Sequence, residues 1–184
     1  MTGKGTPPYA FFVLFKDVTL ESINHKLTQS SDEGVWNLYL ATDSYDVAPK
    51  KRTDNRINEG TTAPVRTFPL PSPFVEKTIE EAAEWLKAAP EDVDLDRHFF
   101  AVLDAHSEPN DTITIARIGD GAVEGREGDV QYFPVKAEEA VMYLDSMTST
   151  AFDERLQSYQ RERSRNGESD LSKGEPYNGP KVTG

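Results

Sequence analysis

The 184-residue chain contains no cysteine. This absence excludes disulfide bonds, thiolate catalysis, and zinc or iron–sulfur centres held by cysteine. The chain also lacks any hydrophobic run that approaches the roughly 20 residues of a membrane-spanning helix. The stretch "YAFFVLF" near the start is too short and too aromatic for a signal peptide, so we expect a strand there.

Positive charge is scarce as well. Lysine and arginine number 20 against 32 aspartates and glutamates, which gives a formal net charge of −12 and a pI near 4.7. Nonspecific binding to nucleic acid or to an anionic membrane needs a positive field, so we expect neither partner. The composition therefore predicts a soluble, acidic, cytoplasmic protein whose partner is a small molecule or another protein.

The length is that of one domain, and 36% of the residues are hydrophobic, which is low for a chain packed throughout. The ends of the chain are the most polar parts. We therefore predict a flexible N-terminus at 1–8, a single α/β domain at 9–160 and a disordered polar tail at 161–184.

Five segments have the composition of strands. "YAFFVLFKD" at 9–17 and "FFAVL" at 99–103 are continuous hydrophobic runs, which are typical of strands buried on both faces. "VWNLYLATD" at 35–43 is a third candidate. "TITIARIG" at 112–119 alternates, and "VQYFPV" at 130–135 follows a glycine-rich connection, so these two are predicted to form an antiparallel hairpin.

Helical spacing of hydrophobic residues follows several of these strands. The clearest helix is "TIEEAAEWLKAAP" at 78–90, where Thr78 and Glu81 form a capping box and Pro90 ends the pattern. Further helices are predicted after residue 19 and over 136–147, with another from about residue 148. The order of elements predicts an α/β (or α+β) fold: a mixed, mainly parallel sheet of about five strands with a C-terminal antiparallel hairpin, covered by helices.

The segments "FFAVLDAHS", "TITIARIG", "VQYFPVKAEEA" and "MTSTAFDERL", with "FVLFKDVTLESI" more weakly, resemble a family of short bacterial and fungal α/β domains classified only as a domain of unknown function. The matching positions are Lys16 and Asp17 after the first strand, Asp104 after the third long strand, and Phe152 in the last helix. The resemblance covers most of 9–160 and excludes the proline-rich insertion and the tail. It implies the fold and no catalytic residue.

Residues 44–77 contain five prolines and no sustained period, so we predict a long loop. Basic residues gather in it on an otherwise acidic protein: Lys50, Lys51, Arg52, Arg56 and Arg66. One interpretation is a solvated flexible loop. The other is an anion-binding lid over the sheet, in which Arg52, Arg56 and Arg66 contact the ligand.

Three predicted strands are followed by aspartate: Asp17, Asp43 and Asp104. If the strands are parallel neighbours, these carboxylates meet at one edge of the sheet, where they could hold a hard cation such as Mg²⁺. Aspartate is also common in the turns and helix caps that follow strands, and we favour this second interpretation. We therefore predict no metal and no cofactor.

His106 follows Asp104 by two residues, and a carboxylate at that spacing can orient an imidazole for general base catalysis if the strand continues to residue 106. The candidate catalytic residues are Asp104, His106 and Asp43. If the chain turns at Asp104, His106 is a loop histidine. Tyr39 and Tyr45, together with Asp17, are further candidates for ligand binding, although aromatic residues around strands usually belong to the core.

No established catalytic motif is present in the sequence. The favoured hypothesis is therefore a noncatalytic module that binds a small molecule or a protein. The alternative is a small cofactor-independent enzyme of the isomerase, cyclase or hydrolase type, which would use the aspartate and histidine at the carboxyl ends of the strands.

Overall fold

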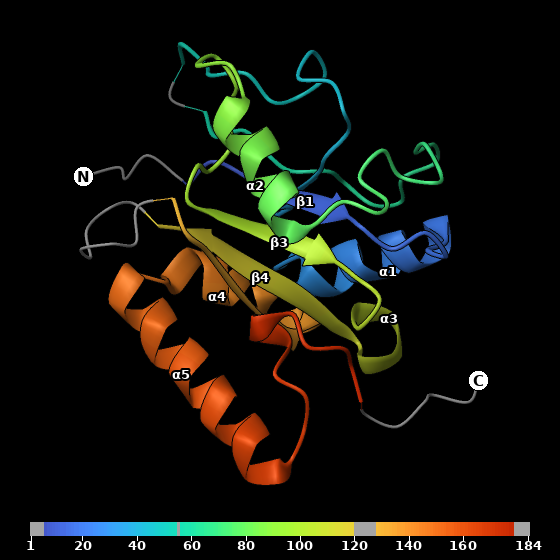
Figure 1. Ribbon diagram of the computed structural model, residues 1–184. Helices are drawn as coiled ribbons and strands as arrows, with labels where there is room; N and C mark the ends of the chain where they lie inside the picture. Colours follow the sequence, from blue (N-terminus) through green and yellow to red (C-terminus); the bar gives the residue numbers. More distant parts are fainter. Residues whose placement is uncertain (1–5, 55, 120–127, 179–184) are drawn as a thin grey trace.

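The computed structural model describes residues 6–54, 56–119 and 128–178, which form a five-stranded mixed sheet with helices on both faces (Figure 1). The order of strands across the sheet is β2-β1-β3-β4-β5, so β3 is the central strand. The strands are β1 (Tyr9–Val13), β2 (Leu38–Leu40), β3 (Phe99–Leu103), β4 (Thr112–Ile118) and β5 (Val130–Lys136).

The four strand pairings divide evenly between the two directions. β1 pairs in parallel with β2 and with β3, whereas β3 with β4 and β4 with β5 are antiparallel. The prediction of a mainly parallel sheet was therefore wrong, and the antiparallel part begins at β3. The reason is the connection between β3 and β4: residues 104–111 are too few for a parallel crossover, which takes a dozen or more. Residues 120–127, between β4 and β5, lie outside the described residues.

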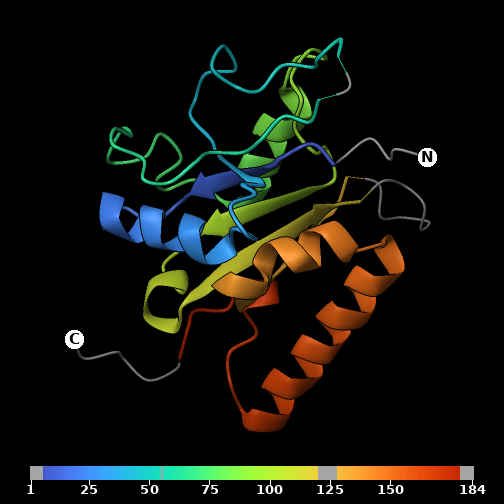
Figure 2. The same cartoon turned by 180° about the vertical axis from the view of Figure 1, so that it is seen from behind.

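Helices cover both faces of the sheet. α2 packs on one face together with the loop that precedes it, while α1 and α4 lie across the other face (Figures 1 and 2). The helices are α1 (Leu20–Ser30), α2 (Ile79–Ala88), α3 (Ser107–Asn110), α4 (Ala140–Ser146) and α5 (Ser149–Asn166), with the short 3-10 helices η1 (Ala137–Glu139) and η2 (Leu171–Lys173). Among the described residues, no helix combines the length and the apolar character needed to cross a membrane.

The continuous hydrophobic run in β1 serves two cores. Tyr9, Phe11 and Val13 point to the side of α1, and Ala10 and Phe12 point to the side of α2. All five are at most 1% exposed. Because neighbouring side chains of a strand point to opposite faces, only a strand covered on both faces needs such a run, and the predicted burial of this segment is confirmed.

α2 forms as the sequence predicts. The Oγ1 of Thr78 accepts from the Glu81 amide at 3.1 Å, and Glu81 Oε2 accepts from the Thr78 amide at 2.8 Å, which completes the capping box. Ala82, Ala83 and Leu86 are fully buried against the sheet. Local capping and one apolar stripe are thus sufficient to predict this element.

In its described residues, 44–54 and 56–77, the loop contains no helix or strand, but it is packed against the domain. The Gly60 and Thr61 amides donate to the carbonyls of Trp36 and Leu38, and Thr61 Oγ1 accepts from the Leu40 amide, so this part of the loop follows the free edge of β2. Further along, Phe74 is buried in the core beside α2. The segment is therefore a structural cover rather than a freely solvated loop.

Gly60 is the closest point between this loop and β2. A Cβ added there would lie well inside van der Waals distance of the Leu38 backbone. We expect Gly60→Ala to push the loop off the strand and to lower the free energy of unfolding by about 1–2 kcal/mol. Urea denaturation measures this, with Thr62→Ala at an exposed neighbour as the control. Equal stability of the two variants would show that the loop does not depend on this approach.

The C-terminal part of the chain is more ordered than predicted. α5 continues to Asn166 and ends at Gly167, whose φ of 68° is the left-handed conformation that favours glycine. The chain then folds back, with Asp170 capping η2 against β5. The prediction of disorder was therefore wrong for 161–178, because capping and burial of Asp170 hold this segment. Residues 1–5 and 179–184 lie outside the described residues.

Candidate functional site

The carboxylate of Asp104 ends β3 and caps the turn that follows. Its Oδ1 accepts from the backbone amides of His106 at 3.0 Å and Ser107 at 3.1 Å and from Ser107 Oγ at 3.1 Å. Its Oδ2 accepts from Thr114 Oγ1 at 2.7 Å. Oδ1 thus accepts three hydrogen bonds and Oδ2 accepts one, so the Asp104 side chain holds the turn and joins it to β4.

His106 lies in this turn and not on the strand, because β3 ends at Leu103. The residue is 8% exposed, and its Nδ1 lies 3.0 Å from Asn110 Nδ2. Since an amide nitrogen only donates, Nδ1 is the unprotonated ring nitrogen. The ring of Tyr177 covers the imidazole at a centroid distance of 4.7 Å.

Burial lowers the pKa of His106, the charge of Arg163 lowers it further, and the charge of Asp104 partly opposes both. The imidazole is therefore held neutral. Asp104 bonds to the backbone of residue 106 rather than to its ring. The structure thus brings the two candidate residues together as parts of one turn, and it does not give them the contact through which a carboxylate orients a general base.

The other two strand-end aspartates follow β1 and β2. Asp17 follows the end of β1 by four residues and is exposed, and Asp43 is exposed beyond β2. β1 separates β2 from β3, which places the ends of these two strands about 10 Å apart. Within the described parts of the chain, no group of three or more histidine, aspartate or glutamate side chains could hold a metal ion.

The basic cluster at 50–56 does not lie over the carboxyl ends of the strands. Lys50 forms a backbone bridge to Val93, which leads into the amino end of β3, so this part of the loop lies at the opposite end of the sheet (Figure 1). Asp54 binds the Nε atoms of Arg52 at 2.7 Å and Arg56 at 2.8 Å. Both guanidinium groups share this one carboxylate, and anion binding by these two arginines stays a prediction.

The remaining candidates lie outside this turn. Arg66 is exposed beside Leu20 at the start of α1. Tyr39 and Tyr45 pack against the core beside α2, and the Tyr45 hydroxyl donates to the Trp85 carbonyl at 2.7 Å. Both tyrosines therefore contribute to the packing of this core, and burial raises the pKa of each hydroxyl.

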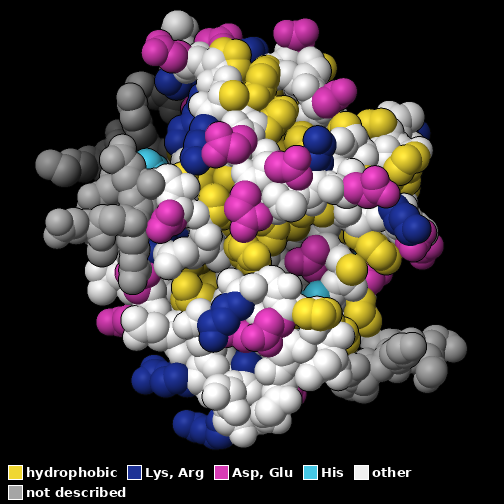
Figure 3. Space-filling model, in the orientation of Figure 1, with side chains coloured by type: hydrophobic (Ala, Val, Ile, Leu, Met, Phe, Trp, Pro, Cys, Tyr) yellow, Lys and Arg dark blue, Asp and Glu magenta, His cyan; other side chains and the backbone are white. Residues whose placement is uncertain are grey.

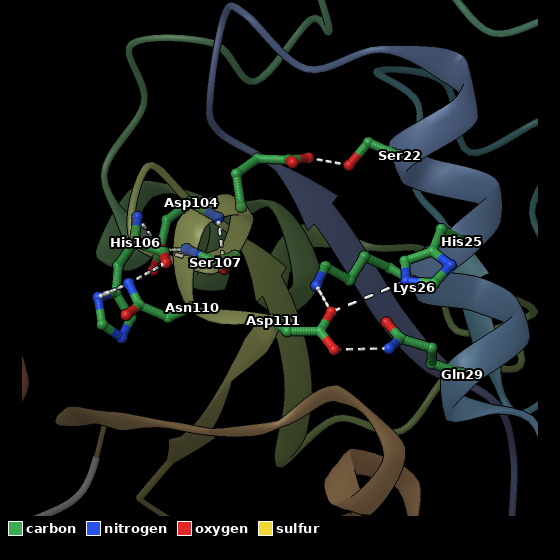
Figure 4. A network of polar contacts seen from close by, with 10 residues as sticks. Ser22, His25, Lys26, Gln29, Asp104, His106, Ser107, Asn110 and Asp111 are labelled. Carbon is green, nitrogen blue, oxygen red and sulfur yellow. Dashed lines mark hydrogen bonds and ion pairs between the residues drawn. The ribbon is translucent and has the colours of Figure 1, made fainter. Parts of the chain in front are cut away.

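A groove of about 760 Å³ lies between α1 and α3, on the other side of the same turn. Two proline-containing segments, at 63–64 and 108–111, form walls opposite the helix. Its lining residues are Thr19, Glu21, Ser22, Asn24, His25, Lys26, Thr28, Ala63, Pro64, Glu108, Pro109 and Asp111. Figure 4 shows how α1 and the turn face one another across polar contacts.

One end of the groove is fixed by a buried lysine. The Lys26 side chain is 3% exposed, and its Nζ lies 2.5 Å from Asp111 Oδ1. Gln29 Nε2 donates to Asp111 Oδ2 at 2.8 Å (Figure 4). The hydrogen bond from Lys26 lowers the pKa of Asp111, so the pair is ionic at neutral pH. This contact joins the middle of α1 to the residue just before β4.

Two further contacts hold the walls of the groove to α1. The Ser22 hydroxyl donates to the Glu108 carboxylate. Asn24 pairs reciprocally with the backbone of Val65: its Nδ2 donates to the carbonyl at 3.0 Å and its Oδ1 accepts from the amide at 2.6 Å. The groove is therefore a built feature, whose shape depends on side-chain contacts between segments distant in sequence.

Sequence reasoning missed the groove because its partners are far apart in the chain. Ser22 and Glu108 are separated by 86 residues, and Lys26 and Asp111 by 85. One local signal was available. Lys26 stands beside Ile23 and Leu27 on the buried stripe of α1, and a lysine at such a position indicates a specific acidic partner.

Comparisons of the chain with protein-family models, with curated protein sequences and with solved structures return no match. The resemblance to a family of unknown function therefore stays a prediction, and the geometry of the groove and the turn is the basis for a functional proposal.

Proposed function

We propose that the protein is a noncatalytic cytoplasmic binding module whose ligand site is the groove between α1 and α3. The observation that carries this proposal is the structural role of Asp104. Its carboxylate accepts hydrogen bonds from two amides and two hydroxyls of the turn and of β4, and it bonds to the backbone of His106 rather than to the imidazole ring. The groove, in contrast, is open and presents polar side chains to a ligand.

The size and lining of the groove favour a small molecule. Ligand sites for small molecules usually occupy about 300–1,000 Å³ and combine apolar walls with a few polar groups. Here Ala63, Pro64 and Pro109 supply apolar surface, and the polar groups come mainly from α1. The contacts of Asn24 and Ser22 hold both walls in place before a ligand arrives, which reduces the ordering cost of binding.

The charge of the groove favours a cation. Lys26 offsets Asp111, which leaves the carboxylates of Glu21 and Glu108 in the lining of the groove. The formal net charge of −12 also favours a cation, and Figure 3 shows acidic side chains over the visible face of the molecule. A compact amine or guanidinium compound with a short aliphatic chain would place its charge near Glu21 and its chain along the prolines.

Agmatine tests this proposal, with malonate as an anion of similar size. We expect millimolar agmatine to raise the Tm of the protein and malonate to leave it unchanged, because a ligand that binds only the folded state stabilises it by mass action. Glu21→Gln is expected to weaken agmatine binding about tenfold, which corresponds to about 1.4 kcal/mol. Isothermal titration calorimetry measures the affinity.

The matched control is Glu154→Gln, which removes the same charge from the exposed surface of α5. Equal affinity of both variants for agmatine would show that the compound responds to the overall negative charge and not to the groove. A Tm that does not respond to agmatine would contradict a cation site in this groove.

A further inference from the structure

The four-residue helix α3 has two functional sides. Glu108 and Pro109, with Asp111 just beyond the helix, line the groove. His106, just before the helix, and Asn110 contact the C-terminal segment instead. Any movement of α3 therefore changes both surfaces together.

The C-terminal segment, residues 168–178, reaches α3 through Tyr177. The Tyr177 hydroxyl donates to Asn110 Oδ1 at 2.9 Å, and its ring packs on His106. Asn110 Nδ2 in turn approaches His106 Nδ1 at 3.0 Å and donates to the His106 carbonyl at 2.8 Å. One amide side chain thus connects the segment to the turn.

The rest of the segment is held along its length. Asp170 is 7% exposed, and its Oδ1 accepts from the Ser172 amide at 3.1 Å. The Ser169 amide donates to Asn178 Oδ1 at 3.0 Å, and η2 packs on β5. The contact with α3 is accordingly the end of a folded segment.

We propose that residues 168–178 form a pH-sensitive latch, whose docking on α3 through Tyr177 keeps the groove in its binding conformation. This inference rests on the proposed function, because it takes the ligand of the groove from there, and it adds regulation of ligand binding by pH. Docking orders α3 and with it the wall that contains Glu108 and Asp111. Release of the latch is therefore expected to weaken ligand binding.

The latch depends on neutral His106. Protonation would place a donor on Nδ1 opposite Asn110 Nδ2, which is also a donor, and would put a positive charge in a buried site. Rotation of the Asn110 amide would remove its bond to the His106 carbonyl. The groups that face the ring are Asp104 from the end of β3, Tyr177 from the latch, and Arg163 from α5.

The direction of the pH effect follows from the lowered pKa of His106 in the folded protein. The released state has the ordinary value of about 6.5 and binds the proton more tightly than the docked state. Docking is therefore at full strength above about pH 6.5. Between that pH and the lower pKa of the docked state, the equilibrium constant for docking falls by about tenfold per pH unit.

Hydrogen exchange on the full chain tests the latch without a ligand. We expect amides of 168–178 to lose protection, relative to intrinsic exchange, between about pH 7.5 and about pH 5. His106→Asn keeps an acceptor at the position of Nδ1 and removes the titration, so its protection should be independent of pH. His98→Asn, at an exposed site before β3, is the matched control and should behave like the wild type. Equal pH dependence in wild type and His106→Asn would overturn the proposal.

Tyr177→Ala and the milder Tyr177→Phe test the coupling to the groove. Release is expected to speed exchange at 107–111 and in α1, and to weaken agmatine binding about fivefold to tenfold. Unchanged exchange in α3 and α1 would overturn the coupling. If the Tyr177 variants speed exchange in α3 and α1 but agmatine binds neither the wild type nor the variants, the latch is supported and the proposed ligand class is contradicted. If agmatine binds both proteins equally, the groove stands and the latch fails.

Discussion

Replacing Leu103 with alanine is expected to lower the free energy of unfolding by about 2–5 kcal/mol. Leu103 is fully buried in the last position of β3, the central strand, among side chains from α1, α4 and α5. The loss combines the transfer free energy of the removed atoms with the cavity that remains, because strands on both sides prevent the site from collapsing. Denaturant unfolding followed by circular dichroism measures it.

Leu103→Met is the control for this change. Methionine has a similar volume and fills irregular space, so the expected cost is below about 1.5 kcal/mol. If Leu103→Ala costs less than about 1 kcal/mol, the position is not part of a tightly packed core, and the central place of β3 would be contradicted.

Removal of the Asp111 carboxylate is expected to cost about 2–3 kcal/mol. The Lys26 ammonium is almost completely buried and has Asp111 as its acidic partner, so the change leaves a buried charge uncompensated. The effect is below the full value for a buried pair because the Asp111 side chain is 60% exposed, which admits water. Asp111→Gly is the suitable variant, since glycine accepts the φ of 54° at this position.

A double-mutant cycle with Lys26→Met separates the ion pair from the backbone effect. Methionine replaces the buried stem without a charge, and in that background Asp111→Gly should cost less than about 1 kcal/mol. The coupling energy is then about 2 kcal/mol. A cost of Asp111→Gly that is equal in both backgrounds would show that Lys26 does not depend on this carboxylate.

The elements of the fold with local signals could be predicted from the sequence. Thr78 and Glu81 define the start of α2, and the hydrophobic runs of β1 and β3 follow from burial on both faces. The direction in which neighbouring strands pair has no such local signal within the strands, because it depends on the length of the connections between them. The eight residues at 104–111 do contain the signal for an antiparallel return. The predicted strand at 35–43 shortens to Leu38–Leu40, where the edge pairs with the loop.

The candidate site was only partly accessible to sequence reasoning. The favoured capping role of aspartate after a strand matches the contacts of Asp104, which involve mainly the next three residues. The environment of His106 could not be predicted, because Tyr177 approaches from a segment that reads as polar and glycine-rich. Likewise the groove requires Lys26 and Glu108 to meet across the fold, and no local pattern specifies such a contact.

The parallel pairing of β1 with β3 also determines how the chain folds. Phe11 stands opposite Ala101, 90 positions later in the sequence, so the centre of the sheet closes only after a long stretch of chain is available. Pairings between such distant residues slow folding and prolong the exposure of hydrophobic segments. During synthesis, β1 therefore cannot pair with β3 until β3 has been made. We expect a chaperone that shields "YAFFV" in this interval to raise the yield of native protein.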